Sequence, residues 1–193
     1  MSAGRNAPPE DPFDLDFTGH FTSLDAPRAV DPAAPITPET LIGAGDLEKH
    51  HYYVNVSHPR PARPVAPAST TVLVLEDDNT TRIILELMLS RDHGYKVRAA
   101  RDVPEFVIAL QKKPLPDLLI LDLELPDGVS GFNILSKMRA HPALREMPVI
   151  IFTSHAEPAQ LNLGLALGAD GYLSKPAKAG ALAAVVKAVL GAG

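Results

Sequence analysis

Residues that could do chemistry follow directly after four short apolar runs of the sequence. They are Glu76, Asp77 and Asp78, then Asp122, then Thr153 and Ser154, and finally Lys175 and Pro176. Carboxylates that lie close together raise one another's pKa unless a cation sits among them. Hard oxygen ligands, together with several water molecules, are the surroundings that Mg²⁺ takes in proteins. If the fold brings these residues together, they predict a magnesium site lined by carboxylate, hydroxyl and ammonium groups.

The apolar runs before these residues have the pattern of buried strands. Residues 72–75, 118–121 and 149–152 are apolar at consecutive positions, which is typical of parallel strands covered by helices on both faces. Residues 95–99 and 171–174 complete five expected strands. Helices are expected over residues 79–90, from Asp102 onward, and over 132–140, 158–167 and 178–190.

Strict alternation of strands and helices predicts right-handed crossovers and a doubly wound α/β fold. In such sheets the ligand crevice lies outside the carboxyl ends of the strands, where the strand order reverses. The polar residues stand at those ends, so they are expected to meet in one crevice. The first helix is expected to be capped by Asp78 or Asn79 and to carry Ile84, Leu87 and Met88 on one face.

Four segments resemble the receiver domain of two-component response regulators. They are VLVLEDDNTTR at 72–82, LLILDLELPDG at 118–128, PVIIFTS at 148–154 and GADGYLSKP at 168–176. The resemblance covers about residues 70–190, and the motifs stand in the family's order. It implies a flavodoxin-like, five-stranded parallel sheet of order 2-1-3-4-5. It also implies phosphorylation of an aspartate by a histidine kinase or a histidine phosphotransfer protein.

The resemblance implies a role for each acidic residue. Asp122 would be the phosphoacceptor. Mg²⁺ would be held by Asp77, by the Asp122 carboxylate and by the backbone carbonyl of Glu124, with Glu76 acting directly or through water. The ion would offset charge on the entering phosphoryl oxygens, so catalysis would consist of positioning and electrostatics. The chain would be a phosphoacceptor signalling protein, not an enzyme beyond its own phosphorylation and dephosphorylation.

Three further residues receive roles from the same resemblance. Lys175 would pair with Asp122 and then with a phosphoryl oxygen, while the Thr153 hydroxyl would bind another phosphoryl oxygen. Thr153 and Tyr172 match the switch positions of the family. The Lys175-Pro176 peptide resembles the family's cis bond, which would aim the lysine into the site.

The loop after Asp122 departs from the family pattern. Nine positions separate Asp122 from Gly131, one more than is common in the family, so the loop is expected to carry one extra residue. Glu124 and His155 fall at positions that modulate the access of water to the acyl phosphate in this family. A glutamate there could orient or repel the attacking water, and the sequence leaves both readings open.

Residues 1–69 hold more than half of the 19 prolines and are expected to form an extended, disordered extension before a domain at 70–193. Phe13, Phe17 and Phe21 recur every four residues, so a motif that folds on binding is an alternative reading there. His50 and His51 are interpreted as solvent-exposed side chains, because adjacent side chains diverge.

The composition excludes several classes of protein. A net charge of -5 lacks the basic surplus that drives nucleic-acid binding, so no nucleic-acid partner is expected. The chain has no cysteine, which excludes disulfides and thiolate metal sites. No apolar stretch is long enough to span a bilayer, and no signal peptide is present, so no membrane partner and a cytoplasmic location are expected.

Two questions about output stay open at this stage. Only residues 191–193 follow the last expected helix, so no output domain is expected and signalling is assigned to protein contacts. Residues 158–193 hold few charges, which predicts a homodimer or partner surface on the fourth helix, fifth strand and fifth helix, including Leu161 and Val186. The alternatives are a pseudo-receiver that binds a partner without phosphorylation, and an enzyme of another doubly wound family. Against the enzyme, the sequence has no glycine-rich phosphate loop after the first expected strand.

Overall fold

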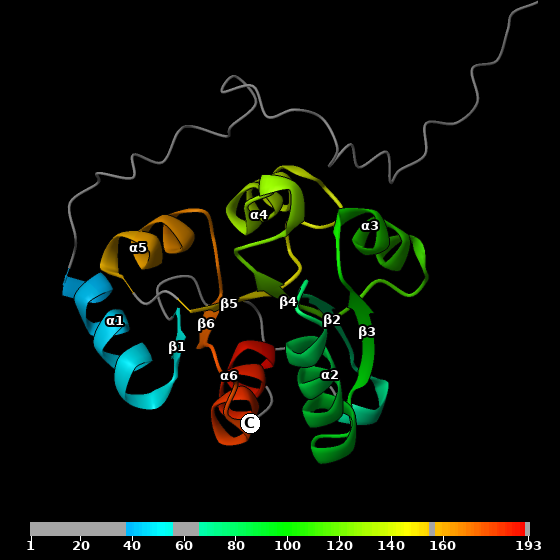
Figure 1. The fold of residues 1–193 in the computed structure, drawn as a ribbon, viewed down its shortest axis with the longest axis horizontal. Coiled ribbons are helices and arrows are strands. Elements are labelled where there is room, and N and C mark those ends of the chain that lie inside the picture. Colours follow the sequence, from blue (N-terminus) through cyan, green and yellow to red (C-terminus); the bar gives the residue numbers. More distant parts are fainter. Residues whose placement is uncertain (1–37, 56–65, 155–156, 192–193) are drawn as a thin grey trace, which may run out of the picture.

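The parallel strands form where the sequence has its leucine-rich and β-branched runs. A computed structural model describes residues 38–55, 66–154 and 157–191 (Figure 1). The five predicted strands are β2 (Thr71–Leu75), β3 (Lys96–Ala100), β4 (Leu118–Asp122), β5 (Val149–Thr153) and β6 (Gly171–Ser174). β2, β4 and β5 are buried along their whole length, as consecutive apolar residues predict.

These five strands are parallel and lie in the order β3-β2-β4-β5-β6. Numbered along the sequence, this is the predicted order 2-1-3-4-5. The chain runs outward from β2 to β3 and then returns across β2 to β4, so the order reverses between β2 and β4. The carboxyl ends of those two strands therefore flank the crevice of a doubly wound sheet.

Helices cover both faces of the sheet (Figure 1). On one face lie α3 (Val103–Gln111), α4 (Gly131–Ala140) and α5 (Pro158–Ala166), and on the other lie α2 (Asn79–Leu87) and α6 (Ala179–Leu190). A π-helical turn, Met88–Asp92, extends α2. Each face has its own apolar core: Phe106, Leu135 and Leu161 are buried over one face, and Leu85, Leu182 and Val186 over the other. The predicted fold class is confirmed.

The buried face of α2 differs from the prediction. Leu85 and Leu89 are fully buried, whereas Ile84 and Leu87 are 41% and 45% exposed. Six of the seven residues from Ile83 to Leu89 are apolar. The apolar stripe is therefore wider than one contact face, and spacing alone could not select the residues that meet the sheet. The helix begins after its N-cap, Asp78, whose carboxylate accepts a hydrogen bond from the backbone N–H of Thr81 at 2.7 Å.

The sheet has a sixth strand that the sequence analysis did not predict. β1 (Tyr52–Val54) pairs antiparallel with β6 and follows α1 (Pro38–His50), which packs beside α5 (Figure 1). The expectation of an extended segment over residues 1–69 is therefore wrong for residues 38–54. The five-stranded parallel sheet becomes a six-stranded mixed sheet with one antiparallel edge strand.

Tertiary contacts, more than local propensity, stabilise α1 and β1. Gly43 and Gly45 weaken α1 as an isolated helix, but Leu47 is 1% exposed within the core that contains Leu161. A Cβ atom at Gly43 would lie 2.9 Å from Leu161 Cδ2, so glycine permits the close approach of α1 to α5. The aromatic and β-branched residues of β1 favour a strand, but three residues are too few to show a periodicity.

Some expectations concern residues outside the described ranges. The phenylalanines Phe13, Phe17 and Phe21 lie there, and so does His155. Within the described ranges, no helix has the length and apolar character needed to cross a membrane.

Candidate functional site

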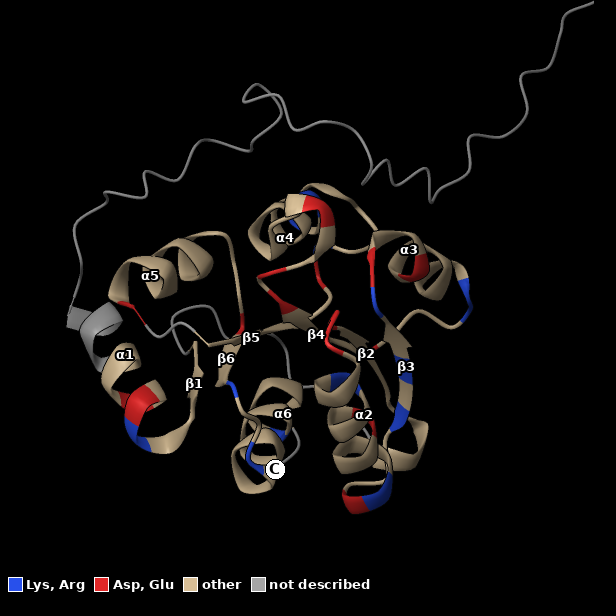
Figure 2. Ribbon diagram, in the orientation of Figure 1, with Lys and Arg blue, Asp and Glu red and all other residues tan. Residues whose placement is uncertain are grey.

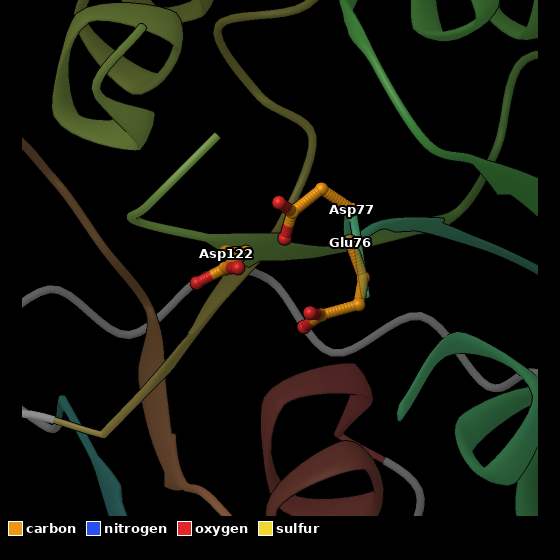
Figure 3. A group of neighbouring side chains, drawn as sticks. All are labelled: Glu76, Asp77 and Asp122. Carbon is orange, nitrogen blue, oxygen red and sulfur yellow. The ribbon is translucent and has the colours of Figure 1, made fainter. Parts of the chain in front are cut away.

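Three carboxylates meet at the carboxyl ends of β2 and β4, where the strand order reverses. Glu76 and Asp77 follow β2, and Asp122 is the last residue of β4 (Figure 3). One carboxylate oxygen from each of the three lies within 4.8 Å of the others. Glu76 and Asp122 are buried, whereas Asp77 is exposed. The cluster therefore has a buried base and one acidic group open to solvent.

Lys175 supplies the cation of this cluster. Its Nζ donates a hydrogen bond to Asp122 Oδ2 at 2.8 Å and another to Glu76 Oε1 at 3.1 Å. Glu76 Oε2 lies 2.9 Å from the same Nζ, but in a geometry that makes no hydrogen bond. Nζ also lies 5.1 Å from the centre of the Phe152 ring. The ammonium group is thus held between two buried carboxylates.

Burial sets the protonation of these groups. It raises the pKa of Glu76 to about 7, an effect to which the Asp122 charge adds and which Lys175 opposes. Burial also raises the pKa of Asp122, against the hydrogen bond and charge of Lys175. For Lys175, burial lowers the pKa, but hydrogen bonds to Asp122 and Glu76 outweigh that effect and raise it. One ammonium does not fully neutralise three carboxylates, so the cluster favours a further cation.

The donor set fits a hard divalent cation. All three side chains offer carboxylate oxygens, which suit Mg²⁺, and the exposed position of Asp77 leaves room for the water ligands that this ion retains. The buried Glu76 Oε2 has no hydrogen-bond partner within the described part of the chain, so an acceptor is available at the base of the cluster. These observations agree with the magnesium site that the sequence predicts.

Arg82 holds the acidic turn between β2 and α2, and the sequence analysis did not single it out. Its guanidinium donates to the backbone carbonyls of Glu76 and Asp77 at 3.0 and 3.2 Å, and to Asn79 Oδ1 at 2.8 Å. Asp78, the N-cap of α2, fixes the same turn from the other side. Two cluster carboxylates therefore project from a turn pinned at several points. The arginine could have been suspected only from its position one helical turn after the acidic residues.

The loop after β4 brings Glu124 back toward the cluster. The Glu124 N–H donates to Asp122 Oδ1 at 3.2 Å, and Glu124 forms an isolated bridge with Ser130. Gly131 lies so close to β4 that a Cβ would be 2.2 Å from the Asp122 carbonyl oxygen. Asp127, at φ 59°, sits at the tip of the loop. The two ends of the loop are therefore fixed against β4, and its middle turns outward.

The structure also places the predicted switch residues. Thr153 ends β5, the strand beside β4, and is 2% exposed, while its carbonyl accepts the Lys175 N–H at 2.8 Å. Tyr172 in β6 is 1% exposed, and its hydroxyl donates to the Leu161 carbonyl at 3.0 Å. The Lys175-Pro176 peptide is cis. Thr153 and Lys175 lie at neighbouring strand ends, while Tyr172 faces the α5 side of the sheet.

Two residues of the apolar face predicted on α5, β6 and α6 are not open to solvent. Leu161 is 2% exposed and Val186 is fully buried, so both expectations of a solvent-facing side chain were wrong. The ribbon of α5 carries no charged residue, as the sequence analysis noted (Figure 2). Leu161 lies in the core that also contains Leu47 of α1, whereas Val186 lies in the core between α6 and the sheet. Within the described residues, the large exposed hydrophobic side chains lie on α2 and α3: Ile83, Ile84, Leu87 and Ile108.

With this fold and site in view, comparison with known proteins identifies the family. The model of the response regulator receiver domain matches residues 72–187, and the chain belongs to that family. Receiver domains are phosphoacceptor signalling domains of two-component systems. They bind Mg²⁺ in an acidic pocket and interact with histidine kinases or phosphotransfer proteins.

The chain is similar to several transcriptional regulators. It is 39% identical over 119 residues to the phosphate regulon transcriptional regulatory protein PhoB of Rhizobium meliloti, covering 62% of this chain and 51% of that protein. It is also 39% identical over 120 residues to the transcriptional regulatory protein GltR of Pseudomonas aeruginosa, covering 62% of this chain and 48% of GltR. The chain thus spans about half the length of the curated relatives it matches.

Solved receiver structures share the fold. A response regulator from Chloroflexus aurantiacus is 35% identical, with a TM-score of 0.58, over 63% of this chain and 98% of that one. The chemotaxis protein CheY4 of Vibrio cholerae is 29% identical, with a TM-score of 0.58 and the same two coverages. These structures therefore match the receiver part of this chain almost from end to end.

Proposed function

We propose that Asp122 accepts a phosphoryl group from a histidine kinase or a histidine phosphotransfer protein, in a reaction that requires Mg²⁺. The observation that carries this proposal is the contact of Lys175 with Asp122 within a cluster of three carboxylates. A lysine held between two buried acids is poised to move onto a phosphoryl oxygen once negative charge arrives. The other two acids then remain to hold the metal.

The reaction balances without another reactant. An Asp122 carboxylate oxygen attacks phosphorus, the bond from phosphorus to the donor histidine nitrogen breaks, and that nitrogen keeps the bonding electrons. Asp77, Asp122 and the Glu124 backbone carbonyl would hold Mg²⁺, with Glu76 acting directly or through water, and the ion would neutralise negative charge on the carboxylates and the phosphoryl oxygens. Lys175 binds one phosphoryl oxygen and the Thr153 hydroxyl binds another.

The structure supports the orientation that this reaction needs. Asp122 Oδ2 accepts from Lys175, and Oδ1 accepts from the Glu124 N–H at 3.2 Å, so the carboxylate is fixed at both oxygens. A fixed nucleophile reduces the entropy lost on reaching the transition state. Glu124 is exposed at the mouth of the site, where its side chain can reach the water that hydrolyses the acyl phosphate. Thr153 and Tyr172 then transmit the effect of phosphorylation to protein partners. We propose that the phosphoryl transfer takes place in the cytoplasm.

Intact-mass measurement after incubation with a small phosphodonor and Mg²⁺ tests the proposal. The chain should gain one phosphoryl group, and Asp122→Asn should gain none. Asp127→Asn is the matched control, because Asp127 is exposed on the same loop and asparagine tolerates its positive φ. A phosphoryl group that persists in Asp122→Asn would move the acceptor elsewhere. A chain that is never modified but still binds a kinase would instead support the pseudo-receiver reading.

A further inference from the structure

His51 directly precedes β1 and connects it to the end of β6. It lies between α1 and β1 in the left-handed region, at φ 67°, where the chain reverses direction. Its carbonyl oxygen accepts the Ser174 N–H at 2.9 Å and the Ser174 hydroxyl at 3.3 Å. Its ring contacts Ser174 Oγ at 3.2 Å through Nδ1 and Lys178 Nζ at 2.6 Å through Nε2. One residue thus contacts two positions of the β6–α6 connection.

Those two positions stand on either side of the site lysine. Ser174 directly precedes Lys175, and Lys178, the N-cap residue of α6, follows it by three positions. The Lys175 N–H is itself fixed by the Thr153 carbonyl at 2.8 Å. The backbone that carries Lys175 is therefore held by β5 on one side and by the α1–β1 turn on the other.

The chemistry of the partners fixes the tautomer of the ring. A lysine ammonium has only donors, so Nε2 of His51 must accept the hydrogen bond from Lys178. Nδ1, the other ring nitrogen, then carries a proton and donates to Ser174 Oγ. The Ser174 hydroxyl in turn donates to the His51 carbonyl. The His51 ring therefore joins Ser174 to Lys178 in one connected network.

We propose that His51 is a positioning residue for Lys175. By clamping Ser174 and Lys178, it holds the lysine-bearing connection so that Nζ reaches Asp122. The inference rests on the proposed function of Asp122, but it assigns a part in that function to a segment that precedes the family's receiver domain, which begins here at residue 72. α1 and β1 are thereby part of the machinery and not only a cover for the sheet.

The length and flexibility of lysine explain why such a clamp matters. Its long side chain has several rotatable bonds, so small movements of its backbone become larger displacements of Nζ. Misplacing a reacting or charge-stabilising group by about 1 Å can slow a reaction up to about a hundredfold. The residues that would hold Mg²⁺ are others: Glu76, Asp77 and Asp122. The clamp should therefore affect phosphoryl transfer while leaving metal affinity unchanged.

Two substitutions at His51 separate its ring from its backbone. His51→Gly keeps the positive φ and the carbonyl acceptor but removes both ring contacts. His51→Asn also tolerates this backbone conformation, and its amide can occupy the place of Nδ1 beside Ser174 while it falls short of Lys178. The neighbouring His50→Gly is the matched control, because His50 is exposed at the end of α1.

The rate of phosphorylation of the full chain by a small phosphodonor is the first readout. His51→Gly should slow it about tenfold, with Mg²⁺ affinity within about twofold of the parent chain, and His51→Asn should restore part of the rate. His50→Gly should leave the rate unchanged. Lys178→Met should slow the reaction like His51→Gly, and combining the two should cost little more than either alone.

Hydrogen exchange at the Ser174 amide gives a readout that does not depend on phosphorylation. It should accelerate in His51→Gly and stay unchanged in His50→Gly. If His51→Gly phosphorylates at the parental rate, or loses rate and Mg²⁺ affinity together, His51 has no positioning role. If the parent chain is never phosphorylated, the proposed function fails by itself, and the exchange data still report whether the clamp holds Ser174.

Discussion

Lys175 and Asp122 make a 2.8 Å contact although they come from strand ends that are not neighbours in the sheet. β5 lies between their strands, so the lysine reaches across the end of β5 and over the Phe152 ring to the carboxylate. Any change that shortens or neutralises this side chain leaves two buried carboxylates without their cation. The first prediction follows from that contact.

Lys175→Met should lower the free energy of unfolding by about 3 kcal/mol at neutral pH, because it leaves the Asp122 carboxylate as an unpaired buried charge and removes the cation that opposes the raised pKa of Glu76. The loss should shrink in acid, where both carboxylates take up protons. Urea unfolding in chelator, at about pH 5 and about pH 8, measures both effects. A loss that is equal at the two pH values would show that missing apolar packing, and not charge, is the cause.

The pKa of Glu76, about 7, predicts how stability without metal depends on pH. The folded pKa lies above the ordinary value of 4.5, so the contribution of Glu76 is fully present below about pH 4.5 and is lost as pH rises through about 7. The full difference corresponds to about 3–3.5 kcal/mol. Mg²⁺ binds the charged form, so it should stabilise the protein most above pH 7.

Glu76→Gln is the variant that isolates this effect. It should flatten the decline of stability with pH in chelator, and it should weaken the pH dependence of Mg²⁺ affinity. Calorimetric titration of Mg²⁺ across the same pH range supplies the second measurement. A parent chain whose Mg²⁺ affinity does not change between about pH 6 and about pH 8 would contradict the assignment of the raised pKa to the metal site.

Gly43 and Gly45 of α1 are a matched pair of positions for testing how α1 packs against α5 and β1. Gly43→Ala should lower the free energy of unfolding by about 1–2 kcal/mol, because its Cβ would lie 2.9 Å from Leu161 Cδ2 and 3.1 Å from the Tyr53 ring. Gly45→Ala has nothing within 4 Å, so better helix propensity should raise stability by about 0.5–1 kcal/mol. Equal shifts in the two variants would mean that α1 does not pack on α5.

Gly164 in α5 predicts a similar contrast around Tyr172. A Cβ there would lie 1.8 Å from the Tyr172 hydroxyl oxygen, so Gly164→Ala should lower stability by about 2–3 kcal/mol and displace that hydroxyl from the Leu161 carbonyl. Gly180→Ala in α6 meets nothing within 4 Å and is the control. Adding Tyr172→Phe to Gly164→Ala should recover part of the loss, and thermal unfolding of the parent, Gly164→Ala, Tyr172→Phe and the double variant measures it. Purely additive losses would refute the contact.

The sequence predicted the parts of the fold that local pattern determines. Consecutive apolar runs located the parallel strands, and their polar ends located Glu76, Asp77, Asp122 and Lys175, which the structure brings together. These predictions succeeded because a buried parallel strand needs an uninterrupted apolar sequence, and because the ends of such strands share one edge.

The predictions that failed concern elements defined by their neighbours. α1 contains two glycines and β1 has three residues, so neither has a strong pattern, and both form because β6 and α5 offer them a surface. His51 was interpreted as an exposed histidine, since nothing local indicates that the chain returns it to Ser174. The buried face of α2 was misjudged because six of the seven residues from Ile83 to Leu89 are apolar, so the apolar stripe is wider than the face that meets the sheet.

The short strand β1 also changes how the sheet meets other polypeptides. An unpaired strand at the margin of a sheet is a template for aggregation, and proteins guard such margins with short strands or charged side chains. Here β1 pairs with β6 and becomes the edge strand on that side of the sheet, and it is only three residues long. The opposite edge strand, β3, carries Lys96 and Arg98. The Arg98 guanidinium donates to the backbone carbonyls of Ala109, in the last turn of α3, and of Lys112 and Pro114, which follow that helix. Neither margin therefore offers a long uncharged strand on which cross-β stacking could begin.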